Sequence, residues 1–154
     1  MIRPAKHQDI PRCRAIMRDA YDRSDYAGTL CGFDDAEATR LLVHAVQKHQ
    51  DGAFFEVAES KGEVEAFIVG ILSRVYCVGT KLRASDLFWL ATDQVEPRQP
   101  RKLMKNMITW ARSNPDVVEV YCGATAVVQD PDKAGRILES LGMKHYGAIY
   151  RLPV

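Results

Sequence analysis

The sequence lacks long apolar runs, a dominant charge and an apolar leader at its start. No apolar run approaches the ~20 residues that a membrane-spanning helix requires, and residues 1–9 lack the apolar core of a secretory signal peptide. The 21 Lys and Arg residues are balanced by 20 Asp and Glu residues, giving a formal net charge of +1. Proteins dedicated to nucleic acid or membrane surfaces usually carry a basic excess. We therefore expect a cytoplasmic protein with no membrane partner and no dedicated nucleic-acid partner.

Cysteine is also scarce, and its spacing excludes the usual zinc and disulfide patterns. The 4 cysteines form no C-x-x-C pair and have no histidine at zinc-site spacing. They are Cys13, Cys31, Cys77 and Cys122. We expect no metal site and reduced thiols that pack as small hydrophobes. A chain of 154 residues buries about 68–70% of the surface that its unfolded chain exposes. Residues 1–154 are therefore predicted to fold as a single domain that needs no disulfide or zinc ion.

Hydrophobic patterns predict ten elements in the order β-α-α-β-β-β-α-β-α-β. Strands are expected at residues 2–4, 53–59, 64–76, 86–92, 117–122 and 148–152. Helices are expected at about residues 10–21, 35–48, 100–112 and 131–141. Neighbouring strands come first, and strands then alternate with helices. This order predicts an α/β (α+β) fold with a mixed, mostly antiparallel sheet.

Individual residues give further detail on these helices and strands. Asp9 is predicted to cap the first helix, with Pro11 in its first turn, and Asp34 or Asp35 to cap the second. Gly70 interrupts the strand at 64–76, which indicates a bulge or a close packing contact. The strands at 86–92 and 117–122 have continuous apolar runs, so we expect both to be buried on both faces.

Three stretches carry a family resemblance. They are M-I-R-P-A-K-H-Q-D-I at 1–10, F-F-E-V-A-E-S-K-G-E-V-E-A-F-I-V-G at 54–70, and A-G-R-I-L-E-S-L-G-M-K at 134–144. In this order, and across nearly the whole chain, the sequence resembles the GNAT superfamily of acyl-CoA N-acyltransferases. The resemblance implies a sheet flanked by about four helices, with acyl-CoA (acetyl-CoA or another) between the splayed fourth and fifth strands. It also implies an amine-bearing acceptor against the loop from Tyr21 to Phe33.

The loop after the fourth strand departs from the superfamily pattern Q/R-x-x-G-x-G/A, whose glycines let backbone N–H groups approach a pyrophosphate. Residues 92–102 read T-D-Q-V-E-P-R-Q-P-R-K, and no glycine occurs between Gly79 and Gly123. Pro97 and Pro100 offer no backbone donor. Basic side chains here could bind phosphate or could simply form a solvated helix face. The residues that the resemblance places at acyl-CoA are Leu90, Ala91, Thr92, Arg98, Gln99, Arg101 and Lys102.

The catalytic pattern departs as well. Many members of the superfamily carry a tyrosine general acid in the last helix, where this chain has Leu138. The nearest chemical substitutes by sequence are Tyr121, Cys122, Tyr146 and Tyr150, each of which could equally be a core or strand residue. An amine must lose a proton before it attacks a thioester, so a general base is required. The catalytic candidates are Asp86, Asp93 and Tyr121, although Asp86 also fits a strand entry and Asp93 a turn.

A second resemblance supports an alternative function. The stretch F-W-L-A-T-D-Q-V at 88–95, followed by a basic helix, resembles degenerate GNAT-fold proteins in the virions of short-tailed phages. It implies a catalytically inactive binding or structural protein, such as a phage virion or assembly component, whose partner is a protein or a second copy. Tyr21, Tyr26 and Phe33 would then form an interface rather than a substrate lid. A nucleic-acid binder fits poorly, because the basic cluster at 98–105 is local.

Overall fold

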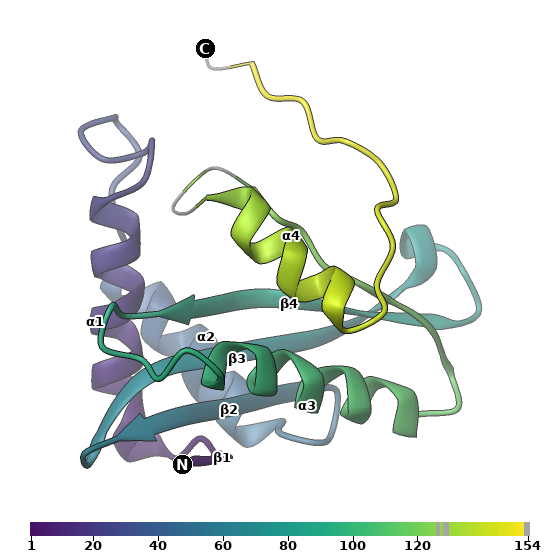
Figure 1. Ribbon diagram of the computed structural model, residues 1–154, viewed down its shortest axis with the longest axis horizontal. Helices are drawn as coiled ribbons and strands as arrows, with labels where there is room; N and C mark the ends of the chain where they lie inside the picture. Colours follow the sequence, from purple (N-terminus) through teal and green to yellow (C-terminus); the bar gives the residue numbers. More distant parts are fainter. Residues whose placement is uncertain (126, 128–129, 153–154) are drawn as a thin grey trace.

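Five strands form one sheet in the order β1-β2-β3-β4-β5 in the computed structural model, which describes residues 1–125, 127 and 130–152 (Figure 1). They are β1 (Ile2–Pro4), β2 (Ala53–Ser60), β3 (Glu63–Arg74), β4 (Leu82–Ala91) and β5 (Val117–Tyr121). Neighbours from β1 to β4 pair antiparallel, and β4 pairs parallel with β5. The mixed, mostly antiparallel sheet predicted from the sequence is confirmed.

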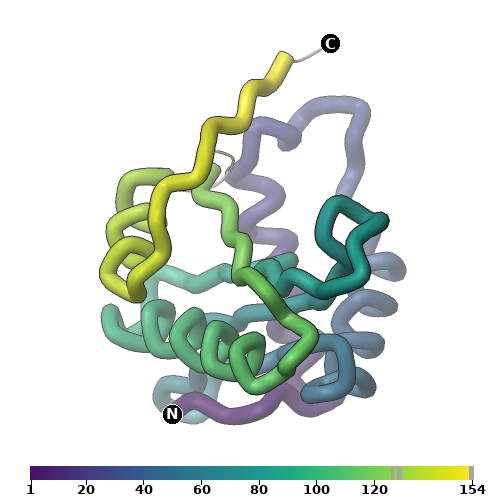
Figure 2. Tube along the Cα trace, turned by 90° about the vertical axis from the view of Figure 1, so that its right-hand side faces the viewer, coloured from purple at the N-terminus to yellow at the C-terminus, as the bar shows by residue number. Residues whose placement is uncertain are grey.

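Helices cover both faces of this sheet (Figure 2). They are α1 (Ile10–Asp22), α2 (Asp35–Gln47), α3 (Gln99–Ser113) and α4 (Pro131–Ser140), with short 3-10 turns at His7–Asp9 and Val75–Cys77. The helices α1 and α2 pack on one face, and α3 and α4 on the other. Among the residues described, no helix is both long and apolar enough to cross a membrane.

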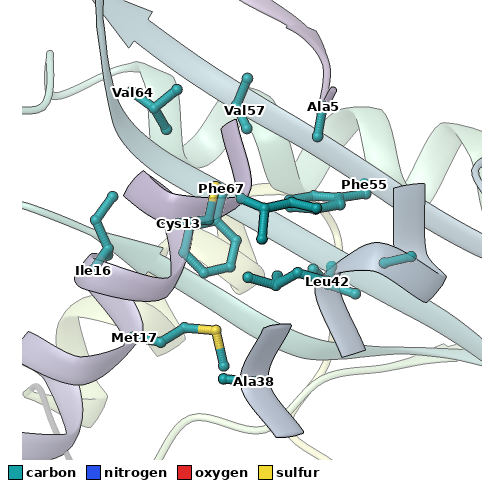
Figure 3. Close-up of a cluster of buried hydrophobic side chains, with 13 residues drawn as sticks. Ala5, Cys13, Ile16, Met17, Ala38, Leu42, Phe55, Val57, Val64 and Phe67 are labelled. Atoms are coloured by element: carbon teal, nitrogen blue, oxygen red, sulfur yellow. The ribbon is translucent and has the colours of Figure 1, made fainter. Parts of the chain in front are cut away.

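Each face of the sheet carries its own hydrophobic core. Successive residues of a strand point to opposite faces, so Phe55 enters the core under α1 and α2, and Phe54 the core under α3. In the first core, the rings of Phe55 and Phe67 meet edge to face at 5.9 Å, beside the buried Leu42 (Figure 3). In the second core, Phe54 packs against Trp110 at 5.5 Å. Burying each such side chain contributes roughly 1.5–3 kcal/mol.

Gly70 serves both roles that its position suggested. The register between β3 and β4 shifts at Val69 and Gly70, which marks a bulge. A Cβ atom at Gly70 would also lie 2.8 Å from the sulfur of Met107 on α3. The absence of a side chain therefore lets α3 approach β3 closely.

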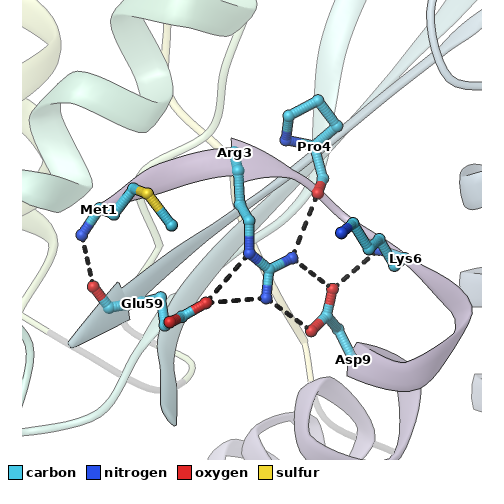
Figure 4. Close-up of polar contacts among 6 residues, drawn as sticks. All are labelled: Met1, Arg3, Pro4, Lys6, Asp9 and Glu59. Carbon is cyan, nitrogen blue, oxygen red and sulfur yellow. Dashed lines mark hydrogen bonds and ion pairs between the residues drawn. The ribbon is translucent and has the colours of Figure 1, made fainter. Parts of the chain in front are cut away.

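The predicted helix caps are only half right. Asp34 caps α2, since its carboxylate accepts the Glu37 N–H at 2.9 Å. Asp9 occupies the N-cap position of α1, as predicted, but its side chain makes no cap hydrogen bond there. Its carboxylate instead accepts two hydrogen bonds from the Arg3 guanidinium, at 2.7 and 2.9 Å, and one from the Lys6 N–H at 2.8 Å (Figure 4). A charge-assisted pair at the start of the chain outcompetes local capping.

The predicted last strand is wrong. Residues 143–152 lie outside helices and strands, and they run away from the body as the yellow segment of Figure 1. In the part of the chain that the structure describes, β5 is consequently an edge strand, and Val118 is 60% exposed. Leu87 on β4 is also exposed. Burial on both faces is therefore wrong for β5, where the described residues place no strand on the outer edge. On β4 the prediction holds in part, since Phe88 and Leu90 pack against one core and Trp89 and Ala91 against the other.

The ion pair of Arg3 with Asp9 yields a stability prediction. Asp9→Asn removes one of the two carboxylates that pair with the largely buried Arg3 guanidinium, while Glu59 remains at 2.9 Å, so we expect a loss of about 1.5–3 kcal/mol in urea unfolding at pH 7. Arg3 lowers the pKa of Asp9. The contribution of Asp9 is thus complete above its ordinary pKa of about 3.9 and is lost as the pH falls through the lowered value. The exposed Asp51→Asn should change stability by less than about 0.5 kcal/mol, and equal effects of the two variants would contradict the prediction.

The close approach at Gly70 yields a second prediction. Gly70→Ala places a methyl group against Met107 and should cost about 1–3 kcal/mol. In a Met107→Ala background the same change should cost less, because the clashing side chain is gone. The matched control is Gly135→Ala in α4, where a new Cβ meets nothing within 4 Å. That variant should gain about 0.5–1 kcal/mol. An additive double-mutant cycle in thermal unfolding would rule out the proposed contact.

Candidate functional site

The strands β4 and β5 pair only along the first part of β4. The pairs run from Leu82 with Val117 to Ser85 with Tyr121. Beyond that point, residues 86–91 of β4 have β3 as their only strand neighbour in the described ranges. One edge of β4 is therefore open over this stretch, on the side from which β5 departs.

The hydrogen-bonding pattern between β3 and β4 decides which backbone groups face the open edge. In an antiparallel ladder, opposed residues alternate between pairs that exchange hydrogen bonds and pairs whose N–H and C=O groups point outward. The Thr92 N–H donates to the Glu65 carbonyl at 2.8 Å, so Leu90, two residues back, also bonds toward β3. The N–H groups of Trp89 and Ala91 point to the open edge. Of the predicted acyl-CoA contacts on β4, Ala91 offers its amide there and Leu90 does not.

Asp86 lies on β4 directly after the last pair with β5. Its half-buried carboxylate is approached by the thiol of Cys122 and the N–H of Gly123, both just beyond β5. Burial raises the pKa of Asp86 above its ordinary value, and these two donors partly oppose that rise. A carboxylate with a raised pKa is a better proton acceptor than a solvated one. The structure thus places a carboxylate with a raised pKa where the two strands part.

Tyr121 and Cys122 lie on opposite sides of the sheet. The Tyr121 ring stacks on the Arg83 guanidinium, whose carbon lies 5.3 Å from the ring centre. The Cys122 thiol lies 3.8 Å from the sulfur of Met104 on α3 and faces Asp86. Burial raises the pKa of this thiol, so it stays protonated at neutral pH. Of the sequence candidates, Asp86 and Cys122 come together, and Tyr121 does not join them.

The first turn of α3 presents few backbone donors. The Gln99 N–H already donates to the Glu96 carbonyl at 2.9 Å, and Pro100 has no N–H. The Trp89 indole N–H donates to the Pro100 carbonyl at 3.1 Å, tying β4 to this turn. The Gln99 side chain is 8% exposed, and its Oε1 has no partner among the residues that the structure describes. This turn cannot surround a pyrophosphate with amides as a glycine-rich loop does.

The predicted phosphate-binding side chains divide into two groups. Arg101 donates to the Ser140 hydroxyl at 3.0 Å and to the Ser140 carbonyl at 3.2 Å, which caps the end of α4. Arg98 and Lys102 are exposed and have no ion-pair partner within the described ranges. Two cations therefore remain available at the start of α3, and the third has a structural partner.

Thr92 and Asp93 directly follow the end of β4. The Thr92 hydroxyl donates to the Glu65 carboxylate, which also accepts from Arg12 at 3.1 Å. Thr92 thus anchors β4 to β3 and α1. Asp93 is exposed in the turn that follows, seven positions along the chain from Asp86.

The expected acceptor side is an aromatic corner between α1 and α2. Tyr21 meets Phe33 edge to face at 5.6 Å, and the Arg18 guanidinium lies over Phe33 at 4.7 Å. Ser24 and Tyr26 belong to the loop between the helices, where Tyr26 is partly exposed. The corner provides aromatic surface beside the ion pair of Arg18 with Asp35, which suits either an acceptor or a protein partner.

Sequence reasoning identified some of these groups and missed others. Leu138, which stands where many members of the superfamily carry a tyrosine general acid, is buried in the core under α3. Its side chain cannot transfer a proton. The outward amide of Trp89 was missed, because an apolar run does not reveal strand register. In the described ranges, no cluster of three or more His, Cys, Asp or Glu side chains could hold a metal ion.

No family model and no curated protein matches the chain in sequence. Solved structures match it along its whole length. Glucosamine-6-phosphate N-acetyltransferase from Arabidopsis thaliana has a TM-score of 0.70 at 13% identity, covering 99% of this chain and 97% of its own. An aminoglycoside 6'-N-acetyltransferase from Acinetobacter haemolyticus has a TM-score of 0.70 at 13% identity, covering 100% and 97%. A predicted acetyltransferase from Clostridium acetobutylicum, solved with acetyl-CoA, has a TM-score of 0.69 at 14% identity, covering 99% and 95%. The chain has the GNAT fold, as the resemblance in its sequence implied.

Proposed function

We propose that the chain is an acyl-CoA-dependent N-acyltransferase whose reaction takes place where β4 and β5 part. The observation that carries the proposal is the open edge of β4, where two amides point outward and Asp86 stands at the junction. The solved structures of similar fold that are titled N-acetyltransferases support the same reaction class. Fold alone does not fix function, so the site residues must carry the chemistry.

Acyl-CoA would be held mainly by side chains at its phosphates. Arg98 and Lys102 offer charge at the start of α3, whereas the turn itself offers few amides. The buried Gln99 Oε1 could accept a hydrogen bond from a ligand amide or hydroxyl. The thioester carbonyl would lie against the N–H of Ala91 or Trp89, which would stabilise the oxyanion that develops during attack.

Asp86 would act as the general base. An acceptor ammonium is not nucleophilic, so Asp86 takes one proton, directly or through water, as the amine attacks the thioester carbon. A C–N bond forms and the C–S bond breaks. The leaving thiolate takes the second proton that the nitrogen loses, so the amide, the CoA thiol and protonated Asp86 result, and protons and charge balance. The protonated Cys122 thiol faces Asp86 and would hold the carboxylate in position.

The amine acceptor would lie against the aromatic corner of Tyr21 and Phe33. The Arg18 guanidinium beside this surface is already ion-paired with Asp35, so the corner favours an acceptor with an aromatic group near its amine.

A second function follows from the small number of phosphate-binding groups at the start of α3. Arg101 is committed to Ser140, and the first turn of α3 has few free amides. These observations favour a GNAT-fold protein that binds a partner without turnover, including the phage virion or assembly role that the sequence suggested. Calorimetric titration that detects no acetyl-CoA binding at millimolar concentration would reject the acyltransferase and leave this function.

The outward amide of Ala91 can be tested directly. Ala91→Pro removes that N–H while sparing the bonds to β3, which is the position where a strand tolerates proline. We expect kcat to fall about 100-fold or more, as for loss of one oxyanion donor, in an assay of free CoA thiol. The matched control Ala91→Ser keeps the N–H and should stay near wild type. Equal activity of the folded proline variant and the control would exclude this amide from the site.

The base can be tested by variant and by pH. Asp86→Asn should lower kcat about 100-fold or more with little change in acetyl-CoA affinity, whereas Asp93→Asn should behave like wild type. Because burial raises the pKa of Asp86, wild-type kcat/KM should fall as the pH drops through that raised value. The low-pH limb should vanish in the residual activity of Asp86→Asn. If Asp93→Asn shows the larger loss instead, the assignment of the base is wrong.

A further inference from the structure

An arginine of β4 lies between two tyrosine rings on the sheet face that carries the aromatic corner. The Arg83 guanidinium carbon is 5.8 Å from the ring centre of Tyr76 and 5.3 Å from that of Tyr121. The next residue, Ala84, belongs to the core under α3, and successive residues of a strand point to opposite faces. Arg83 therefore points to the face on which α1 and α2 pack, where the acceptor is proposed to lie.

The half-buried Arg83 guanidinium has few partners within the protein. Its Nε donates to the Ser73 hydroxyl over 3.4 Å, which is long for a hydrogen bond. Glu119 lies opposite Arg83 in the register of β4 and β5, yet Arg83 forms no ion pair with any of the residues that the structure describes. The terminal nitrogens of Arg83 thus keep a planar set of donors for a ligand.

The turn between β3 and β4 presents Tyr76 to Arg83 with a strained backbone. Tyr76 and Cys77 have positive φ angles of 48° and 65°, which residues other than glycine rarely adopt. Such strain gathers at binding sites and active sites. The Tyr146 hydroxyl approaches that of Tyr76, and this contact raises the pKa of Tyr146. We call Tyr76, Arg83, Tyr121 and Tyr146 the Arg83 cluster.

A hollow leads from the Arg83 cluster to the point where β4 and β5 part. It has a volume of about 650 Å³, and its lining includes Tyr121, Tyr146 and Cys122. Cys122 faces Asp86, which follows Arg83 by three positions on β4. Three residues of a strand span roughly 10 Å, so a small ligand of about that length reaches from Arg83 to the proposed base.

We propose that Arg83 binds a carboxylate of the acceptor, and that the acceptor is an amine whose carboxylate lies several bonds from its nitrogen. This inference rests on the proposed acyltransferase function. A carboxylate fits because its two oxygens accept two parallel N–H donors of a guanidinium. Glu119, across from Arg83, would repel a dianion more than a monoanion, which favours a carboxylate over a phosphate. The surrounding tyrosine rings suit an aromatic ring beside that carboxylate.

Binding of two matched ligands tests the site without turnover. The probe is para-(aminomethyl)benzoate, and the comparison is para-(aminomethyl)benzamide, which has the same shape and amine but no carboxylate. In calorimetric titration of the full chain, with and without CoA, the benzoate should bind at least tenfold more tightly. Arg83→Gln should weaken benzoate binding at least tenfold and leave benzamide binding unchanged. Equal binding of the two ligands by the wild-type chain, or no benzoate binding at millimolar concentration, overturns the proposal.

The matched control is Arg136→Gln, which removes an exposed arginine from α4 on the opposite face of the sheet. It should bind both ligands as the wild-type chain does. Arg83→Lys keeps the charge without the planar donors, so it should restore only part of the benzoate affinity. Equal losses in Arg83→Gln and Arg136→Gln would contradict a specific site. The comparison of the two ligands on the wild-type chain decides the question even if Arg83→Gln does not fold.

Turnover separates this inference from the function on which it rests. In an assay of CoA thiol released from acetyl-CoA, KM should be at least tenfold lower for the benzoate than for the benzamide. Arg83→Gln should remove that difference without changing KM for acetyl-CoA. If the benzoate binds through Arg83 but neither amine is acylated, the acyltransferase fails and the carboxylate site stands. If both amines are acylated with equal KM, the acyltransferase stands and the carboxylate site fails.

Discussion

Strand β4 is held on one side by β3 along nearly its whole length, and on the other by β5 only as far as Ser85. The functional geometry depends on this unequal pairing. It leaves two amides of β4 directed into open space, and it brings Asp86 to the point where pairing stops. It also carries the chain after β5 toward α3, which seats Cys122 against Met104 and Asp86. Were β5 paired to the end of β4, those amides would be consumed in the ladder.

Local signals made much of the fold predictable. Asp34 caps α2 because a short carboxylate satisfies helix-start donors wherever it occurs, and Gly70 marks a bulge and a close helix approach because only glycine fits both. The failures share one cause, namely partners distant in sequence. Asp9 bonds to Arg3 across the entry to α1 rather than capping it, and residues 148–152 have strand composition but no strand beside them among the residues that the structure describes. Composition describes what a segment can do, and a partner decides whether it does so.

The site was predictable in kind but not in detail. Asp86 was a candidate because the family resemblance places a carboxylate base on the fourth strand, yet its contact with Cys122 arises from the parallel register of β4 and β5, which no single sequence reveals. Successive N–H groups of a strand point alternately toward its two edges. Whether Leu90 or Ala91 carries the outward amide therefore depends on a register that is exact to one residue. Arg101 was grouped with its basic neighbours by composition, whereas its guanidinium serves the end of α4. Register and long-range hydrogen bonding supply what charge and spacing cannot.

The adjacent phenylalanines of β2 have a consequence for how the molecule unfolds. Phe54 anchors one core and Phe55 the other, so the two helical layers share a single strand. Any shift of β2 that loosens one ring displaces the other, because one backbone positions both. The layers on either side of the sheet are thus unable to melt independently, and the molecule should lose its structure as one cooperative unit.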